Sequence, residues 1–376
     1  MNNNITYERY QRQIILKGFG LAGQQKLLQA KVLVIGAGGL GCPALQYLAG
    51  TGIGCIGIVD DDMVSLTNLH RQVLYAVHDI GQSKAIKAKE KLQQLNPEIN
   101  IIAYKERLTT QNALAIIGGF DIVIDGTDNF ASRYLINDAC VLMKKPLVYG
   151  AVSQFEGQVA VFNYQNNDDT ATVNYRDLFP HPPKDDEVLN CAEAGVLGVL
   201  PGIIGTMQAS EAIKLITGIG KPLINLLLTY NVLNNSMFEL SISSNAEKIS
   251  LIPNNENDFK LMDYEWLCSS ANKEYEIDGA TFNNFLLEKN IAFIDVRELD
   301  ELPLITAFNH TQTPLSQFIK NIPAIENGTI ILFCQSGKRS RQAVQILLDA
   351  VGNSKKIFSL KGGIINWLKA YQNKKI

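Results

Sequence analysis

A glycine-rich turn lies between a short apolar run and a helix pattern in the first fifty residues. The apolar run is VLVI at 32–35, and GAGGLG follows it. Glycines let a backbone approach a phosphate closely, and the following helix N-terminus stabilises the phosphate's negative charge. The glycines of this turn are Gly36, Gly38, Gly39 and Gly41. Asp60 ends the next predicted strand, where a carboxylate can bind ribose hydroxyls, so the pattern predicts a nucleotide site and leaves the nucleotide open.

Three further charged residues narrow the choice of nucleotide. Arg71 follows Asp60 along the chain, Lys84 begins a predicted helix, and Asp128 follows a later strand. Arginine and lysine neutralise phosphate charge, and an aspartate can hold a hard cation such as Mg²⁺. We therefore predict a nucleoside triphosphate with magnesium. A nicotinamide-dependent oxidoreductase on the same glycine turn is the alternative, and a non-catalytic scaffold for a protein partner is a third interpretation.

A cysteine near the C-terminus directly follows an apolar strand pattern and precedes a helix pattern. The segment reads TIILFCQSGKRS, with the cysteine at Cys334. In such a turn the backbone N–H groups point at the sulfur, and the nearby basic side chains add positive charge, which favours a thiolate or persulfide nucleophile. A phosphatase-like loop would have a similar form. The predicted cradle comprises Cys334, Gly337, Lys338 and Arg339.

Two α/β regions must position these residues. In the first, strand and helix patterns alternate, which predicts a mostly parallel Rossmann-like sheet with helices on both faces. The predicted parallel strands are 32–35, 55–60, 99–103, 120–125 and 146–150. Later strands at 158–164, 223–232 and 237–240 form an antiparallel appendix. We predict a Rossmann-like first domain over 1–253, a linker over 254–273 and a small second α/β domain over 274–376.

Composition and charge exclude several classes of protein. The 376 residues hold 34 Lys+Arg and 37 Asp+Glu, so no basic excess suggests a nucleic-acid or membrane partner. The N-terminus lacks a signal-peptide pattern, and the longest apolar run, 195–207, is too short to span a bilayer. The six cysteines have no paired spacing, so we expect reduced thiols and a cytoplasmic protein.

Long, ordered motifs over about residues 5–240 resemble the ubiquitin-activating-enzyme-like adenylyltransferases. The closest type is the one that activates molybdopterin-synthase or thiamine-type sulfur carriers. The motifs are RYQRQ at 9–13, GAGGLGCPALQYLAGTGIG at 36–54, VDDDMVSLTNLHRQ at 59–72, GQSKA at 81–85, DGTDNFASRYLINDAC at 125–140 and NCAEAGVLGVLPGIIGTMQASEAIKL at 190–215.

This resemblance implies a homodimer with one ATP site in each subunit. Arg12 would reach the triphosphate of the partner subunit, Asp128 would hold magnesium and Arg71 and Lys84 would bind ribose or phosphates. The full nucleotide-binding set that we expect is Arg12, Gly36, Gly38, Gly39, Gly41, Asp60, Thr67, Asn68, Leu69, His70, Arg71, Lys84, Asp128 and Asn129. The residues expected to carry the chemistry are Arg71, Lys84, Asp128, Cys191 and Cys334.

The resemblance also implies the substrate. It would be a small ubiquitin-fold sulfur-carrier protein that ends in Gly-Gly, whose terminal carboxylate attacks the α-phosphate of ATP and forms an acyl-adenylate. Cys191 matches the mobile-loop cysteine of the family, and a helix start after it would favour its thiolate.

The second domain resembles a rhodanese domain over about residues 274–372. The motifs are DVRE at 295–298, CQSGKRS at 334–340 and LKGGIINW at 360–367. Where rhodaneses have a His-Ile-Pro-Gly segment, this chain has LPLITAFNH at 302–310. We expect Cys334 to carry a persulfide that delivers sulfur and makes a thiocarboxylate, with a cysteine desulfurase as a candidate sulfur donor.

Zinc is not expected, although relatives often bind it through two Cys-x-x-Cys pairs. At the first position this chain reads NYRD at 174–177, and at the second it reads PNNEND at 253–258. A tetrahedral structural zinc site needs all four ligands. Asp177 and His181 alone do not rebuild one.

Overall fold

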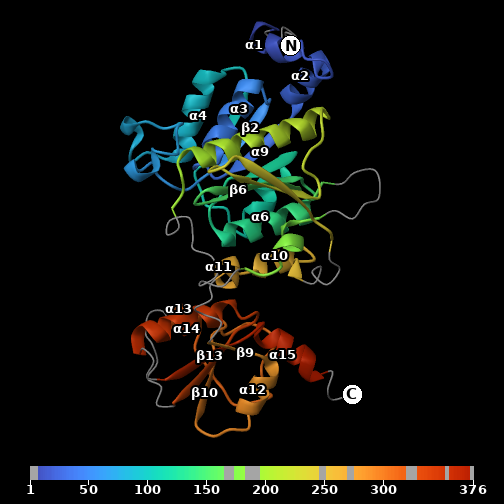
Figure 1. Cartoon of the computed structure of the whole chain (residues 1–376). Coiled ribbons are helices and arrows are strands. Elements are labelled where there is room, and N and C mark those ends of the chain that lie inside the picture. The colour runs from blue at the N-terminus through green and yellow to red at the C-terminus, as the bar shows by residue number, and fades with distance from the viewer. Residues whose placement is uncertain are drawn as a thin grey trace. The chain divides into compact units, whose positions relative to one another are not determined.

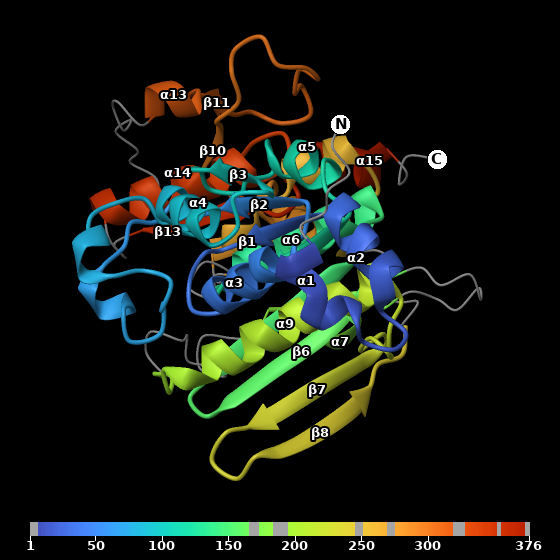
Figure 2. The same ribbon diagram turned by 90° about the horizontal axis from the view of Figure 1, so that it is seen from above.

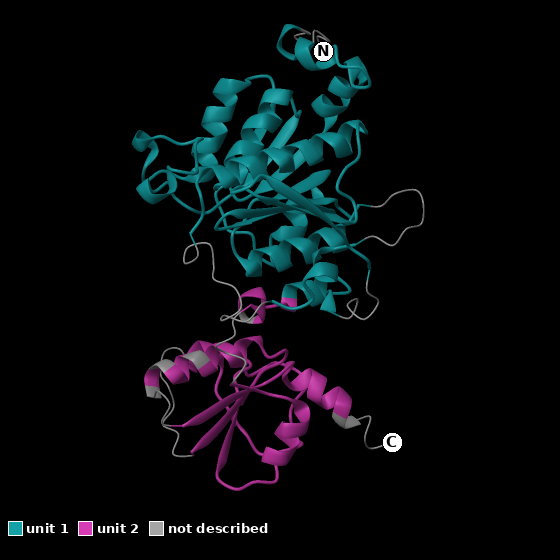
Figure 3. Ribbon diagram, viewed as in Figure 1, with its two compact units in different colours: residues 1–260 teal, residues 261–376 magenta. Residues whose placement is uncertain are grey.

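The computed structural model describes residues 7–164, 173–182, 195–244, 251–268, 275–318, 328–351 and 355–372. The chain divides into two compact units, Met1–Lys260 and Leu261–Ile376 (Figures 1 and 3). This division falls inside the segment 254–273 that we predict to be a linker. The predicted domain boundaries themselves stay a prediction.

Unit 1 is built on one eight-stranded sheet with the order β3-β2-β1-β4-β5-β6-β7-β8. The strands are β1 (Lys31–Ile35), β2 (Cys55–Val59), β3 (Asn100–Tyr104), β4 (Ile122–Asp125), β5 (Leu147–Ser153), β6 (Glu156–Phe162), β7 (Leu226–Asn231) and β8 (Ser236–Ser241). Strands β1 to β5 pair in parallel, whereas β5 to β8 pair antiparallel. The predicted mostly parallel sheet with an antiparallel appendix is therefore confirmed.

Helices cover both faces of this sheet, which explains why its central strands are continuous apolar runs. In Figure 1, α3, α4 and α9 lie on one face and α6 on the other. Figure 2 shows α9 running along the sheet above β6. The helices are α1 (Tyr7–Ile14), α2 (Gly20–Gln29), α3 (Gly41–Thr51), α4 (Lys84–Leu95), α5 (Ala113–Gly118), α6 (Phe130–Met143), α7 (Tyr175–Leu178) and α9 (Val199–Thr217). None of the described helices is both long and apolar enough to cross a membrane.

Three short helices lie in segments for which no helix is predicted from the sequence. The polar stretch 166–190 includes α7, and the predicted linker includes α10 (Glu256–Leu261) and α11 (Tyr264–Leu267). Phe259 on α10 and Tyr264 on α11 are buried, so the described part of that linker is folded. These helices have only four to six residues, which is too short for periodicity to reveal them.

Unit 2 has a five-stranded parallel sheet with the order β11-β10-β12-β13-β9. The strands are β9 (Glu276–Ile277), β10 (Ile291–Asp295), β11 (Thr311–Gln312), β12 (Thr329–Phe333) and β13 (Lys356–Leu360), and the helices are α12 (Gly279–Phe285), α13 (Leu315–Phe318), α14 (Lys338–Val351) and α15 (Gly363–Gln372). Two apolar clusters flank this sheet, one centred on Phe318 and Leu347 and the other on Phe282 and Trp367. The apolar strand predicted before Cys334 is β12, whereas no pattern marks the two-residue edge strands β9 and β11.

A buried ion pair fixes α7 to α6. The Arg176 Nε donates to Asp138 Oδ1 at 2.8 Å, and Nη2 donates to Oδ2 at 2.7 Å. The arginine side chain is 2% exposed and the aspartate is fully buried. The guanidinium also lies over the ring of Tyr134, 4.7 Å from its centroid. This pair holds the chain in place just before residues 183–194, which include Cys191 and lie outside the described residues.

We predict that Asp138→Ala lowers the free energy of unfolding of unit 1 by about 3–5 kcal/mol, because it leaves a guanidinium buried without its carboxylate. The matched control is Asp138→Leu with Arg176→Met, which should recover most of the loss. Urea unfolding followed by circular dichroism measures the change. The chain's two tryptophans, at 266 and 367, both lie in unit 2, so their fluorescence transition should not move. An unchanged circular dichroism transition would contradict this role of the pair.

Candidate active site

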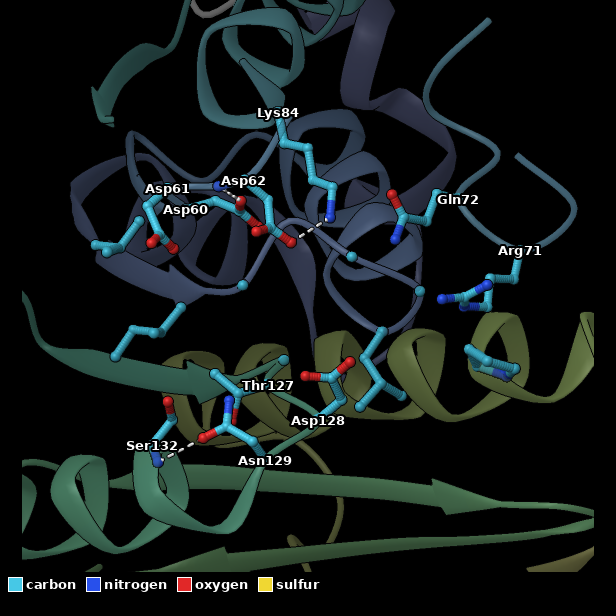
Figure 4. A pocket seen from close by; sticks show the side chains of 18 of the residues that line it. Asp60, Asp61, Asp62, Arg71, Gln72, Lys84, Thr127, Asp128, Asn129 and Ser132 are labelled. Atoms are coloured by element: carbon cyan, nitrogen blue, oxygen red, sulfur yellow. Dashed lines mark hydrogen bonds and ion pairs between the residues drawn. The ribbon is translucent and has the colours of Figure 1, made fainter. Parts of the chain in front are cut away.

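A pocket of about 670 Å³ lies where the parallel strands of unit 1 end (Figure 4). This is the edge at which open α/β sheets bind ligands, and the volume suits a nucleotide. Nine of the residues predicted from the sequence line it: Gly36, Gly38, Gly39, Asp60, His70, Arg71, Lys84, Asp128 and Asn129. The sheet thus brings together residues from five separate segments of the chain, at 36–39, 60, 70–71, 84 and 128–129.

The floor of the pocket depends on two turns that touch each other. Gly36 follows β1 with a φ of +91°, a backbone conformation that favours glycine. A Cβ at Gly36 would lie 2.7 Å from the carbonyl oxygen of Gly126, the residue that follows β4. A Cβ at Gly126 would in turn lie 2.8 Å from the carbonyl oxygen of Gly36. Only glycine at both positions allows the two turns to approach this closely.

Asp60 at the end of β2 is held by backbone donors. Its Oδ2 accepts from the Ala37 N–H at 2.7 Å, and its Oδ1 accepts from the Asp62 N–H at 2.8 Å. Burial raises the pKa of this carboxyl, while the charge of Lys84 opposes the rise. Asp60 therefore fixes the glycine turn and still presents a carboxylate at the pocket wall, as a ribose-binding acid requires.

Two cations approach the pocket from the segment between β2 and α4. Lys84 is the first residue of α4, is 5% exposed, and its Nζ donates to Asp62 Oδ2 at 2.8 Å. Arg71 is half-buried, and its Nη1 donates to the carbonyl oxygen of Thr67 at 3.2 Å. The side chain of Arg71 also passes beside Gly39, because a Cβ added at Gly39 would lie 3.6 Å from the Arg71 Cδ. Figure 4 shows Lys84 and Arg71 at two different sides of the pocket.

The segment after β4 contains two aspartates with different environments. Asp125 is 1% exposed and accepts from the Thr127 N–H and Oγ1, at 2.9 and 2.6 Å. Asp128 is exposed and lines the pocket, so its carboxylate can reach a bound ion. Asn129 accepts from the Ser132 N–H at 2.9 Å and thereby caps α6. The buried aspartate shapes the turn, and the exposed one is the carboxylate that suits a hard cation.

Five of the predicted nucleotide-binding residues do not line this pocket: Arg12, Gly41, Thr67, Asn68 and Leu69. Gly41 instead packs inside the turn, because a Cβ there would lie 1.9 Å from the carbonyl oxygen of Gly36. Thr67 positions Arg71 through its carbonyl group. Arg12 lies on α1, outside the pocket lining.

Sequence reasoning missed several polar residues of the pocket. They are Asp61, Asp62, Gln72, Glu106, Arg107, Thr127, Ser132 and Arg133. The run of three aspartates at 60–62 is a signal that could have identified Asp62. Glu106 and Arg107 follow β3, and the rule that parallel strands end at one edge could have placed them there.

In unit 2, Cys334 directly follows β12 and lies at the base of a closed turn. Its Sγ accepts from the Gly337 N–H at 3.2 Å and from the Ser340 Oγ at 3.6 Å. Gly337 and Gly363 both have positive φ, and a Cβ at Gly363 would lie 2.5 Å from the amide nitrogen of Ser336. The KGG segment at 361–363 therefore forms the second wall of the cradle.

The basic residues of this cradle differ in their surroundings. Arg339 forms an ion pair with both carboxylate oxygens of Glu301, which the sequence analysis did not anticipate. The hydrogen bond from Arg339 lowers the pKa of Glu301. Lys338 begins α14 and is half-buried. Glu301 belongs to the segment that precedes LPLITAFNH, so this ion pair ties that segment to the cradle.

Comparison with protein families finds a matching family model for each of the two units. The model of the ThiF family matches residues 10–251, which is more than half of the chain. The chain belongs to the ThiF family. A rhodanese-like domain model matches residues 280–370. These matches agree with the adenylyltransferase and rhodanese resemblances, and they favour ATP over a nicotinamide cofactor in the pocket of the ThiF domain.

Curated relatives combine the same two domains. The probable adenylyltransferase/sulfurtransferase MoeZ of Mycobacterium tuberculosis is 40% identical, and the match covers 97% of this chain and 93% of the relative. The adenylyltransferase and sulfurtransferase MOCS3 of Aedes aegypti is 39% identical over 92% of this chain and 82% of its own. The sulfur carrier protein adenylyltransferase of Thermus thermophilus is 48% identical, over 69% of this chain and 96% of the relative.

Solved structures agree with the fold of the ThiF domain. The structure of Escherichia coli MccB with ATP has a TM-score of 0.54 and 22% identity, with coverage of 65% of this chain and 73% of MccB. PaaA has a TM-score of 0.53 and 23% identity, with coverage of 65% and 76%.

We predict that Gly36→Ala abolishes detectable ATP binding by isothermal titration calorimetry, because the new Cβ pushes apart the two turns that form the pocket floor. Gly18→Ala is the matched control, since Gly18 has a φ of +89° and no atom within 4 Å of an added Cβ. Both substitutions cost about 1–2 kcal/mol of stability through backbone strain. Equal ATP affinities of the two variants would contradict the proposed importance of the close approach.

Proposed function

We propose that this chain adenylates the C-terminal Gly-Gly carboxylate of a ubiquitin-fold sulfur-carrier protein and then converts it to a thiocarboxylate. The observation that carries the proposal is the combination, in one chain, of a nucleotide-sized pocket that holds Arg71, Lys84 and Asp128 at the sheet edge and a cradled cysteine in a rhodanese-like domain. The names of the MoeZ and MOCS3 relatives pair the same two activities. All five cysteines among the described residues are free thiols, which supports a reducing compartment such as the cytoplasm.

In the first step a carboxylate oxygen of the carrier attacks the α-phosphorus of ATP, and the bond to the bridging oxygen breaks to release pyrophosphate. Asp60 would hold the ribose, and Arg71 and Lys84 would stabilise the charge that shifts onto the phosphates. A magnesium ion on Asp128 would neutralise further phosphate charge. Because no side chain needs to form a covalent bond here, the rate gain comes from positioning and charge stabilisation.

Arg12 would serve the pocket of a second copy of the chain. α1 is fixed to Thr51 and Asn96, residues that precede β2 and β3, so it lies where these strands begin. The pocket lies where they end, and five residues of strand span about 17 Å. Arg12 therefore lies at the opposite end of these strands from the pocket of its own subunit. Ile15 and Leu16, just after α1, are exposed at 68% and 56%, which is consistent with a protein partner there.

In the second step the terminal sulfur of a Cys334 persulfide would attack the carbonyl carbon of the acyl-adenylate, and AMP would leave. A thiol then reduces the resulting sulfur–sulfur bond and releases the carrier thiocarboxylate. The Gly337 N–H and Ser340 hydroxyl would stabilise the sulfur anion. A cysteine desulfurase is the class of enzyme that would supply the persulfide sulfur. Cys191 lies outside the described residues, and its role stays a prediction.

We also propose that this chain folds without structural zinc. At the first position where relatives have Cys-x-x-Cys, Asn174 and Asp177 are hydrogen-bonded to each other at 2.8 Å and cap α7. At the second, Asn255 and Asp258 form the same 2.8 Å bond at the start of α10. Zinc in structural sites prefers thiolate and imidazole ligands, so these donors do not fit it. Side-chain hydrogen bonds would close both turns instead.

We predict that Asp128→Ala lowers carrier-dependent ATP–pyrophosphate exchange at least about 100-fold, as expected when a charged group that stabilises the transition state is removed. The matched control is Asp61→Ala, a neighbouring exposed carboxylate of the same pocket that the proposal gives no role in magnesium binding. Exchange that does not require the carrier, or that survives intact in Asp128→Ala, would contradict the proposed adenylation.

We predict that Cys334→Ser abolishes sulfur transfer from thiosulfate to cyanide, while pyrophosphate exchange stays at the wild-type rate. Cys268→Ser is the control, since Cys268 is a half-buried thiol of the same unit that is no part of the cradle. Loss of both activities in Cys334→Ser would contradict the proposal that adenylation and sulfur transfer take place in separate domains.

We predict that the purified chain contains far less than one zinc per subunit and that a chelator leaves its unfolding temperature unchanged. Asp177→Ala should lower the stability of unit 1 by about 1 kcal/mol, the usual value of a capping interaction. Elemental analysis and thermal unfolding measure both effects. Stoichiometric zinc whose removal lowers the unfolding temperature would contradict the proposal.

A further inference from the structure

The first helix is held to the ThiF domain by a buried tyrosine. Tyr10 is 1% exposed, and its Oη accepts a hydrogen bond from Asn96 Nδ2 at 2.8 Å. Its ring lies directly against Gly52, where a Cβ would come within 2.6 Å of the ring and its hydroxyl. Asn96 is itself fully buried and also donates to the carbonyl oxygen of Ala49 at 2.8 Å. The tyrosine therefore fits between the ends of α3 and α4.

Two neighbours on α1 add contacts to the same ends of α3 and α4. Arg9 Nη1 donates to the carbonyl oxygen of Leu95 at 3.0 Å, and Gln13 Nε2 donates to that of Thr51 at 2.9 Å. The buried Gln24 of α2 donates to the Thr51 carbonyl oxygen as well, at 3.1 Å. A helix of eight residues is not stable in water by itself, so α1 depends on these contacts for its position.

Arg12 is on the other side of the helix. Successive residues of an α-helix are about 100° apart, so Arg12 lies about 200° round the axis from Tyr10. It is exposed, whereas Tyr10 is buried. The contacts that fix α1 therefore direct Arg12 away from its own subunit.

We propose that Tyr10, together with Asn96 and Gly52, positions Arg12 for the nucleotide pocket of the partner subunit. This inference rests on the proposed function, in which Arg12 acts across a homodimer. Tyr10 does not touch the nucleotide. It is a positioning residue, and its loss lowers ATP affinity in the other subunit rather than in its own.

Mixed dimers of the full chain test this directly. Two copies with different affinity tags are co-expressed, and the mixed species is purified on both tags in turn. One copy carries Arg71→Ala with Lys84→Ala, which silences its own pocket, so the dimer binds one ATP at the intact pocket of the other copy. Tyr10→Ala is placed either on the silenced copy or on the intact copy. ATP with Mg²⁺ is titrated by calorimetry, which also reports the number of sites.

Tyr10→Ala on the silenced copy should weaken ATP binding about tenfold, the value of one hydrogen bond to a charged group. The same substitution on the intact copy should leave the affinity unchanged. Tyr10→Phe, which keeps the ring against Gly52, should cause a smaller loss in the same arrangement. Gly52→Ala on the silenced copy displaces Tyr10 without changing the sequence of α1. It should weaken ATP binding as Tyr10→Ala does.

Arg12→Ala in the same two arrangements separates this inference from the proposed function. If Arg12→Ala on the silenced copy leaves the ATP affinity of the intact pocket unchanged, or if no mixed dimer forms, the proposed role of Arg12 across the dimer is wrong. If Arg12→Ala weakens binding there but Tyr10→Ala does not, only the positioning role of Tyr10 is wrong. Weaker binding when Tyr10→Ala is on the intact copy would indicate a general structural role and would overturn the inference.

Discussion

The site depends on the contact between two backbone turns that leave neighbouring parallel strands. Gly36 after β1 and Gly126 after β4 approach so closely that neither position has room for a Cβ. Asp60 strengthens the arrangement from the side, because its carboxylate accepts the Ala37 N–H. With these turns in place, Lys84, Arg71 and Asp128 face one pocket although they are distant in the sequence. A change to the backbone here would separate groups whose charges act together.

Much of this site follows from the sequence because its residues obey a rule of topology. Continuous apolar strands in alternation with helices predict a parallel sheet, and the residues after such strands meet at one edge. Gly36, Asp60 and Asp128 could be placed in this way. Residues whose positions depend on packing between loops could not. Arg133 reaches the pocket from the first turn of α6, and Gln72 from an irregular segment, without a pattern that marks either one.

In unit 2, as in unit 1, contacts that depend on packing between loops could not be predicted from the sequence. Cys334 and its cradle follow a recognisable strand–turn–helix pattern, so the sequence predicts them. The ion pair between Arg339 and Glu301 depends on a segment that departs from the rhodanese pattern, and only the structure reveals it. The edge strands β9 and β11 have two residues each, which is too short for any periodicity. In unit 1, Arg12 could be identified by its motif, but only the contacts of Tyr10, Arg9 and Gln13 show which way it faces.

The central claim is that one chain first activates a carrier's Gly-Gly carboxylate with ATP and then replaces an oxygen of it by sulfur. Intact-mass spectrometry of a recombinant ubiquitin-fold Gly-Gly protein, incubated with the chain, ATP, Mg²⁺, thiosulfate and a thiol reductant, tests both steps together. The expected result is a mass increase equal to the difference between sulfur and oxygen, and only when ATP is present. An unchanged carrier mass, or a thiocarboxylate that forms without ATP, would contradict it.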